Sequence, residues 1–137
     1  MKITLIRHGR TIGNVKGCFN GVTNDPLCDD GVETIKEYVE KGIYPEVGIV
    51  VSSPLKRCLQ TSNLIYPQHK PIVVDNLREI NFGDFENKTH LQLENNPDYI
   101  RWIKSNGTSD IPNGESFKAF TDRCVKAVSY THLRAHE

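Results

Sequence analysis

Short apolar runs alternate with segments of helical periodicity along this chain. Three of the runs are rich in β-branched residues and end at turn-forming residues, which is typical of strands buried on both faces. These predicted strands cover residues 2–6, 48–53 and 71–74. Apolar positions at helical spacing predict helices over 32–39, over 55–65, over 90–103 with a break at 95–98, and over 116–128. The last nine or so positions match neither pattern.

Turn and capping residues mark where these elements begin. Turn-forming residues crowd the segment 21–31, and Asp29 or Asp30 is expected to cap the helix that follows. Pro54 is expected at the start of the next helix, where its missing N–H costs nothing. A further loop is predicted over 105–116. Because strands alternate with helices, the sequence predicts an α/β fold with a mostly parallel sheet flanked by helices.

Composition limits the classes of partner that this chain can have. Its 137 residues fit one domain, and its 17 basic and 17 acidic residues balance to a net charge of zero. Bulk electrostatics therefore predict no nucleic-acid partner. The chain has no apolar run of about 18 residues and no signal-peptide pattern, which predicts no membrane partner. Its four cysteines form no Cys-x-x-Cys pair, so we expect a cytoplasmic protein with reduced thiols.

Polar side chains follow each of the three predicted strands. Arg7 and His8 follow the first strand, Arg57 lies one helical turn beyond the second, and Glu79 follows the third. Because the carboxyl ends of parallel strands meet at one edge of a sheet, we expect these side chains to share a rim. Each residue taken singly is more typical of a structural or surface role. The prediction of a site therefore depends on their coincidence at three successive strand ends.

These residue types point to phosphoryl transfer. The planar fork of arginine matches the oxygens of a phosphate group. An unprotonated histidine can act as a nucleophile, and a glutamate can supply the proton that a leaving group needs. Competing phosphate chemistries lack their motifs, because the chain has no GxxxxGK[ST] loop, no GxGxxG after a strand, no Cys followed six positions later by Arg, and no HExxH. The sequence also offers no acidic cluster for Mg²⁺.

Five segments form an ordered series of motifs along the chain. They are LIRHGRTIGN at 5–14, GVTNDPLCDDG at 21–31, SSPLKRCLQT at 52–61, LREINFGDFEN at 77–87 and PNGES at 112–116. Together they resemble the histidine phosphatase superfamily, in its phosphoglycerate-mutase-like group, whose fold is a three-layer α/β sandwich. Segments 80–89 and 96–105 are more similar to the small phosphatases of that group, of the α-ribazole phosphatase type, than to its mutases.

The resemblance implies a role for each residue that matches a motif. His8 is the nucleophile that forms a phosphohistidine, and Glu79 is the proton donor. The two arginines of the motifs bind the phosphoryl group and stabilise its developing charge. The implied substrate-binding residues are Arg7, Asn14, Asn20, Gly21 and Arg57. The resemblance implies no metal and no cofactor.

The chain departs from the family's pattern in two places. Arg10 stands where the family often has Glu, Gln or Lys. The family's second catalytic histidine lies in a His-Gly-Gly motif after a further strand, but His132 follows Arg123 too closely for a helix end, a turn and a strand. We therefore expect an incomplete domain over 1–128, its C-terminal part missing, followed by an atypical tail over 129–137 of foreign or out-of-frame origin. The missing strand is expected to leave an unpaired apolar edge.

The predicted function is a phosphomonoesterase that hydrolyses a small phosphorylated metabolite through a phosphohistidine. The candidate substrate implied by the resemblance is α-ribazole 5′-phosphate, in cobalamin biosynthesis. Two alternatives stay open: a phosphoglycerate mutase, and a non-catalytic fragment that binds a phosphorylated ligand. The sequence sets no oligomeric state, and it leaves open whether the truncated chain folds or is active.

Overall fold

Two short parallel strands form the sheet of this protein, whose computed structural model describes residues 2–134. Strand β1 (Val51–Ser52) pairs with β2 (Ile72–Val73), with Val51 opposite Ile72 and Ser52 opposite Val73. The helix between them makes the parallel crossover that the strand–helix alternation predicted. The α/β class with a parallel sheet is therefore confirmed, although both strands are shorter than the predicted ranges.

The first predicted strand is wrong. Residues 2–6 form no strand, and their side chains are exposed, with Leu5 92% accessible. A strand buried on both faces needs neighbouring strands that pair with it and helices that cover it. Within residues 2–134 no strand pairs with this segment, so its apolar side chains stay in contact with solvent.

Helix α2 (Asp29–Glu40) forms where the apolar spacing predicts it, but its cap is not an aspartate. Cys28 is the N-cap, and its sulfur accepts a hydrogen bond from the Gly31 amide. Asp29 and Asp30 lie in the first helical turn, where their charge suits the positive end of the helix dipole. A short helix that the sequence did not predict, α1 (Ile12–Lys16), precedes it. Thr11 and Asn14 start α1 with a reciprocal capping box.

Helix α3 (Lys56–Ile65) lies between the two strands in sequence and packs against α2. Its N-cap is Leu55, so Pro54 lies one residue before the cap and not at the first helical position that we expected. The Leu55 amide donates a hydrogen bond to Ser53 Oγ at 3.3 Å. The two helices enclose an apolar cluster of buried side chains, which are Leu27, Ile35, Ile65 and Tyr66.

The second half of the chain has short helices followed by one long one. They are η1 (Asp75–Leu77), η2 (Gly83–Phe85), α4 (His90–Leu93), α5 (Pro97–Lys104) and α6 (Phe117–Arg134). The predicted break at 95–98 is present, because Asn96 caps α5 and Pro97 takes its first position. Helix α6 continues past its predicted end at 128, and residues 135–137 of the predicted tail lie outside the described residues.

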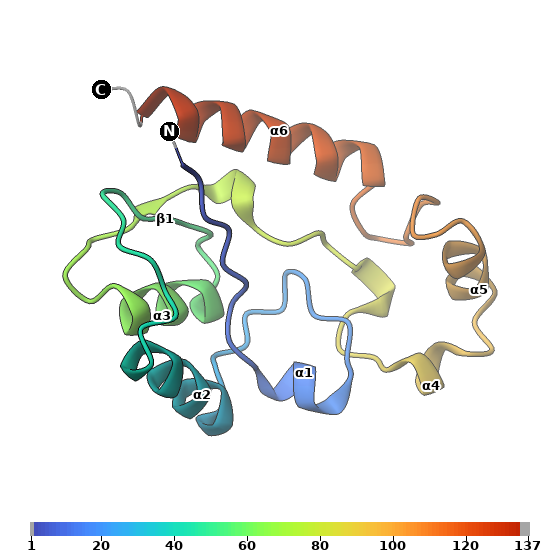
Figure 1. Ribbon diagram of the computed structural model, residues 1–137. Helices are drawn as coiled ribbons and strands as arrows, with labels where there is room; N and C mark the ends of the chain where they lie inside the picture. Colours follow the sequence, from blue (N-terminus) through green and yellow to red (C-terminus); the bar gives the residue numbers. More distant parts are fainter. Residues whose placement is uncertain (1, 135–137) are drawn as a thin grey trace.

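A second apolar cluster is formed by side chains of η2, α4, α5 and the loops next to them. Its buried members are Ile80, Phe85, Leu93, Tyr99 and Ile111. Figure 1 shows α2 and α3 at one end of the molecule, α4 and α5 at the other, and α6 running across both halves. The N-terminal segment before α1 runs between these two ends, and α3, which carries Arg57, lies at the first of them. None of the helices within residues 2–134 has the length and apolarity that crossing a membrane requires.

Candidate active site

His8 is half-buried at the end of the N-terminal segment and has a defined tautomer. Its Nδ1 lies 2.7 Å from the carbonyl oxygen of Gly9. A carbonyl can only accept a hydrogen bond, so in the neutral ring Nδ1 carries the proton and Nε2 keeps its lone pair. Nε2 is therefore the nitrogen available for attack on an electrophile.

The surroundings of His8 favour its neutral form. Burial is the largest cause that lowers the pKa of His8, and the cations Arg57 and Arg7 lower it further. The bond to the Gly9 carbonyl and the charge of Glu79 act in the opposite direction but do not outweigh burial. The imidazole is therefore unprotonated at neutral pH. The same effects show that Arg7, Arg57 and Glu79 are near enough to His8 to act on its charge.

Thr61 ties the His8 loop to helix α3. The amide of Gly9 donates to Thr61 Oγ1 at 3.0 Å, and that hydroxyl donates in turn to the Arg57 carbonyl at 2.7 Å. Thr61 is buried, so water does not compete strongly for either bond. The histidine and Arg57 are consequently positioned by one hydrogen-bonded chain.

The guanidinium of Arg57 is buried, with only 2% of the residue accessible, and it holds the backbone of segment 20–23. Nη1 donates to the Thr23 carbonyl at 2.8 Å, and Nη2 donates to the carbonyls of Gly21 at 2.8 Å and Asn20 at 3.3 Å. A guanidinium has five N–H donors. Three are used by these carbonyls, which leaves two without an acceptor among the described residues.

Glu86 holds the same segment 20–23 from its amide side. Its carboxylate accepts hydrogen bonds from the amides of Gly21, Val22 and Thr23, from the Thr23 hydroxyl at 2.6 Å, and from the Phe82 amide. Carbonyls of the segment therefore face a cation while its amides face an anion. Glu86 was not singled out by the sequence analysis. The available signal was its place in the LREINFGDFEN motif, three residues after Gly83.

Close approach explains the glycine at position 21. A Cβ atom built on Gly21 would lie 1.7 Å from the backbone oxygen of Ile80. No side chain fits there, because the segment 20–23 packs directly on the backbone that follows Glu79. This contact brings two of the predicted motifs together.

The two predicted asparagines use their side chains within the chain. Asn14 Oδ1 accepts from the amide and the hydroxyl of Thr11, at 3.0 and 3.1 Å. Asn20 Nδ2 donates to Asp25 Oδ2 at 2.6 Å. Both residues thus shape the loops around the site, and their role in binding a substrate stays a prediction.

Arg7 and Glu79 lie at the exposed rim of the site. Both are solvent-accessible, and Glu79 Oε1 accepts a hydrogen bond from the Ile80 amide at 2.9 Å. His132, the weak candidate for a second catalytic histidine, is exposed on helix α6 and does not follow a strand. Within residues 2–134, no three metal-ligating side chains lie together in a way that could hold a metal ion.

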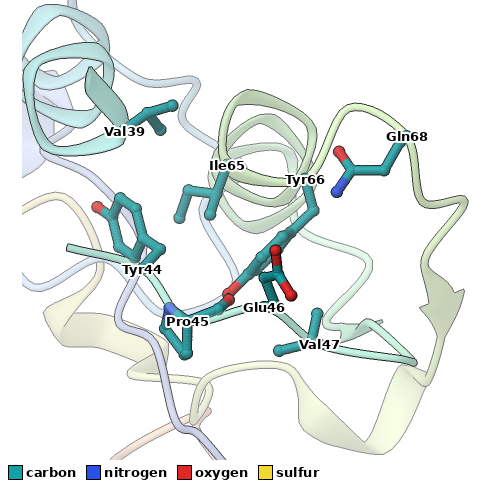
Figure 2. Close-up of a pocket in the computed structure, with 8 residues that line it drawn as sticks. All are labelled: Val39, Tyr44, Pro45, Glu46, Val47, Ile65, Tyr66 and Gln68. Carbon is teal, nitrogen blue, oxygen red and sulfur yellow. The ribbon is translucent and has the colours of Figure 1, made fainter. Parts of the chain in front are cut away.

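Two cavities flank helix α3. One, of about 310 Å³, reaches His8 and separates residues 4–6 from β1 and α3. Its walls are mostly apolar, and it lies beside the exposed N-terminal segment. The other, of about 320 Å³, lies between the ends of α2 and α3, where Tyr66 donates to the Pro45 carbonyl (Figure 2). No predicted site residue lines it.

Comparison with known proteins identifies the family. Residues 3–137 match the family described as the histidine phosphatase superfamily (branch 1), and the chain belongs to it. The adenosylcobalamin/alpha-ribazole phosphatase of Salmonella typhimurium is 32% identical over an alignment of 136 residues, and the match covers 94% of this chain and 66% of that protein. A Proteus mirabilis protein named "Probable phosphoglycerate mutase GpmB" is 29% identical, with 94% of this chain and 62% of that protein covered.

A solved structure supports the same relationship. The crystal structure of the alpha-ribazole phosphatase from Shigella flexneri superposes with a TM-score of 0.84 at 29% identity, covering 96% of this chain and 67% of that one. The family, the parallel α/β fold and the predicted resemblance are thereby confirmed. The chain spans 66% of the length of the Salmonella relative.

Proposed function

We propose that this protein is a metal-independent phosphomonoesterase that works through a phosphohistidine at His8. The observation that carries the proposal is the pairing of a neutral imidazole, whose Nε2 lone pair is available, with a buried guanidinium that keeps two N–H donors. Membership of the histidine phosphatase superfamily supports the same reaction.

The proposed reaction has two steps. Arg7 and Arg57 bind the phosphoryl oxygens, and His8 Nε2 forms a bond to phosphorus while the ester P–O bond breaks. Glu79 gives its proton to the departing oxygen, which leaves as an alcohol. Water then attacks the phosphohistidine, Glu79 takes a proton from it, and inorganic phosphate leaves from the restored imidazole.

The proposed substrate is a small phosphorylated metabolite, and α-ribazole 5′-phosphate of cobalamin biosynthesis is the first candidate. The names of the Salmonella and Shigella relatives support it. Asn14, Asn20 and Gly21 are proposed to line the substrate pocket. We also propose a cytoplasmic location, since all four cysteines are free thiols.

The test combines turnover with trapping of the intermediate. The protein is mixed with α-ribazole 5′-phosphate and with p-nitrophenyl phosphate, and released phosphate is measured. Acid-labile ³²P on the quenched protein reports the phosphohistidine. We expect both signals from the parent chain, and neither above background from His8→Ala. The matched control, His69→Ala, is expected to retain them. Normal turnover by His8→Ala would refute the proposal.

A phosphoglycerate mutase is the second candidate, favoured by the similarity to the Proteus mirabilis protein. It would also label His8, but it would return the phosphoryl group to a second hydroxyl of the substrate. Conversion of 3- to 2-phosphoglycerate with little release of phosphate would select the mutase over the phosphatase.

A further inference from the structure

Arg123 on helix α6 has a guanidinium whose five N–H donors are all used within the chain. Nη1 donates to the carbonyls of Asn76 at 2.9 Å and Arg78 at 2.7 Å. Nη2 donates to the Glu79 carbonyl at 3.0 Å and to Glu115 at 2.7 Å, and Nε donates to Glu115 at 2.6 Å. No donor is left for a ligand, so Arg123 differs in kind from Arg57.

Glu115 binds both Arg123 and the segment that Arg123 holds, residues 76–81. Its carboxylate binds Arg123 through both oxygens, and its Oε2 also accepts from the Asn81 amide at 3.3 Å. The Glu115 amide donates to the Asn81 carbonyl at 2.9 Å. The hydrogen bond from Arg123 is the largest cause that lowers the pKa of Glu115, which keeps the carboxylate charged. The residue Arg123 is only 9% accessible, and a paired charge of this kind is costly to disrupt.

The segment so held carries the predicted proton donor. Beyond the η1 cap at Arg78, residues 79–81 lie in no helix or strand that would fix their course. Glu79 is exposed, so packing of its side chain does not fix its position either. The bonds from Arg123 to the Arg78 and Glu79 carbonyls, which flank the Cα of Glu79, therefore set where the Glu79 side chain begins.

We propose that Arg123, oriented by Glu115, is a positioning residue that holds Glu79 at the distance needed to protonate a leaving group at His8. The proposal rests on the proposed phosphatase function and extends it to a residue that touches no substrate. It involves no new covalent step, because Glu79 gives the same proton to the same departing oxygen.

Leaving groups of different basicity separate this role from simple support of the fold. An alkoxide such as that of glycerol needs a proton as the P–O bond breaks, whereas p-nitrophenolate is stable enough to leave without one. Misplacing Glu79 should therefore slow hydrolysis of glycerol 2-phosphate much more than hydrolysis of p-nitrophenyl phosphate. KM should change little, since Arg7 and Arg57 stay in place.

The experiment compares Arg123→Lys and Glu115→Gln with Glu79→Gln in the full chain. We expect kcat for glycerol 2-phosphate to fall by about 10²-fold in the first two variants, within the range that general acid catalysis supplies. We expect kcat for p-nitrophenyl phosphate to fall less than about threefold, as for a group whose proton is not needed. The double variant Arg123→Lys/Glu79→Gln should be no slower than Glu79→Gln alone, because both changes remove the same function, proton donation by Glu79. Arg101→Lys, at an exposed pair with Asp98, is the matched control and should be unchanged.

Three results would overturn the proposal. They are an equal loss for both substrates, a multiplicative loss in the double variant, and unchanged kinetics in both Arg123→Lys and Glu115→Gln. If Arg123→Lys does not fold by circular dichroism, Glu115→Gln alone decides, because it removes the negative charge that orients the guanidinium and leaves Arg123 itself unchanged. A failure of the proposed function would give other results: the parent chain would not hydrolyse either substrate, or His8→Ala would remain active.

Discussion

His8 is controlled at the scale of single residues by one carbonyl and by nearby charges. The Gly9 carbonyl fixes which ring nitrogen carries the proton, and burial with two arginines lowers the pKa of the ring. Arg57 shows the same division of labour, because three of its donors shape the loop and two remain for an anion. Residues of one type therefore differ in their bonding: Arg57 keeps two N–H donors that no group in the described residues accepts from, and Arg123 keeps none.

The titration of His8 should reflect these charges. Because its pKa is lowered, the midpoint of the His8 ring titration by NMR is expected below 6.5. The phosphorylation rate should rise with pH through that midpoint, since only the unprotonated ring attacks. Arg7→Gln removes a cation that lowers the pKa, so the midpoint should move upward. A midpoint above 6.5 in the parent chain, or a downward move in the variant, would contradict this account.

At the scale of elements, segment 20–23 is the piece that joins the two halves of the site. It has no regular secondary structure, and its conformation is set by Arg57 on its carbonyl side and by Glu86 on its amide side. Gly21 lets it lie directly on the backbone at Ile80. The loop is therefore ordered by long-range partners and not by its own turn residues.

Glu86→Gln should loosen this loop. The variant loses charge-assisted bonds to several amides, which we expect to lower the free energy of unfolding by about 1–3 kcal/mol. The KM for a phosphomonoester should also rise, because Arg57 loses the carbonyls that orient it. Glu94→Gln, at an exposed position, is the matched control, with an expected change within about 0.5 kcal/mol. Equal melting curves for the two variants would disprove the role given to Glu86.

At the scale of the whole molecule, the N-terminal segment forms an edge whose apolar side chains are exposed to solvent. Ile3, Leu5 and Ile6 are exposed there, and a cavity of about 310 Å³ separates residues 4–6 from β1. Exposed apolar surface next to unpaired backbone groups favours association between molecules. The edge that the sequence analysis expected from a missing strand stays a prediction.

Leu5→Lys should reduce self-association. A charge at the most exposed apolar position of this edge raises the cost of burying it against another molecule. Light scattering at increasing protein concentration should show a smaller mean mass than for the parent chain. Leu91→Lys, at an exposed leucine on α4, is the control and should leave the association unchanged. An equal effect of both variants would show that the edge is not the cause.

Local sequence patterns predicted much of the fold, and the predictions that were wrong have a common cause. Helices α2, α3, α5 and α6 were predicted from apolar spacing, which depends on neighbours within one or two turns. The strand over 2–6 and the cap at Asp29 or Asp30 were not borne out. A strand exists only where another strand pairs with it, and the choice of Cys28 as cap depends on where the chain enters α2.

The sequence by itself determined the family, the class of fold and the residues proposed to meet a phosphate, because motif order and residue chemistry are properties of the chain. Only the tertiary structure decided which donors of each arginine are free. Those bonds join positions about 35 and 45 residues apart, such as Arg57 to Gly21 and Arg123 to Glu79. Contacts of this range depend on how the chain closes on itself, which no local pattern encodes.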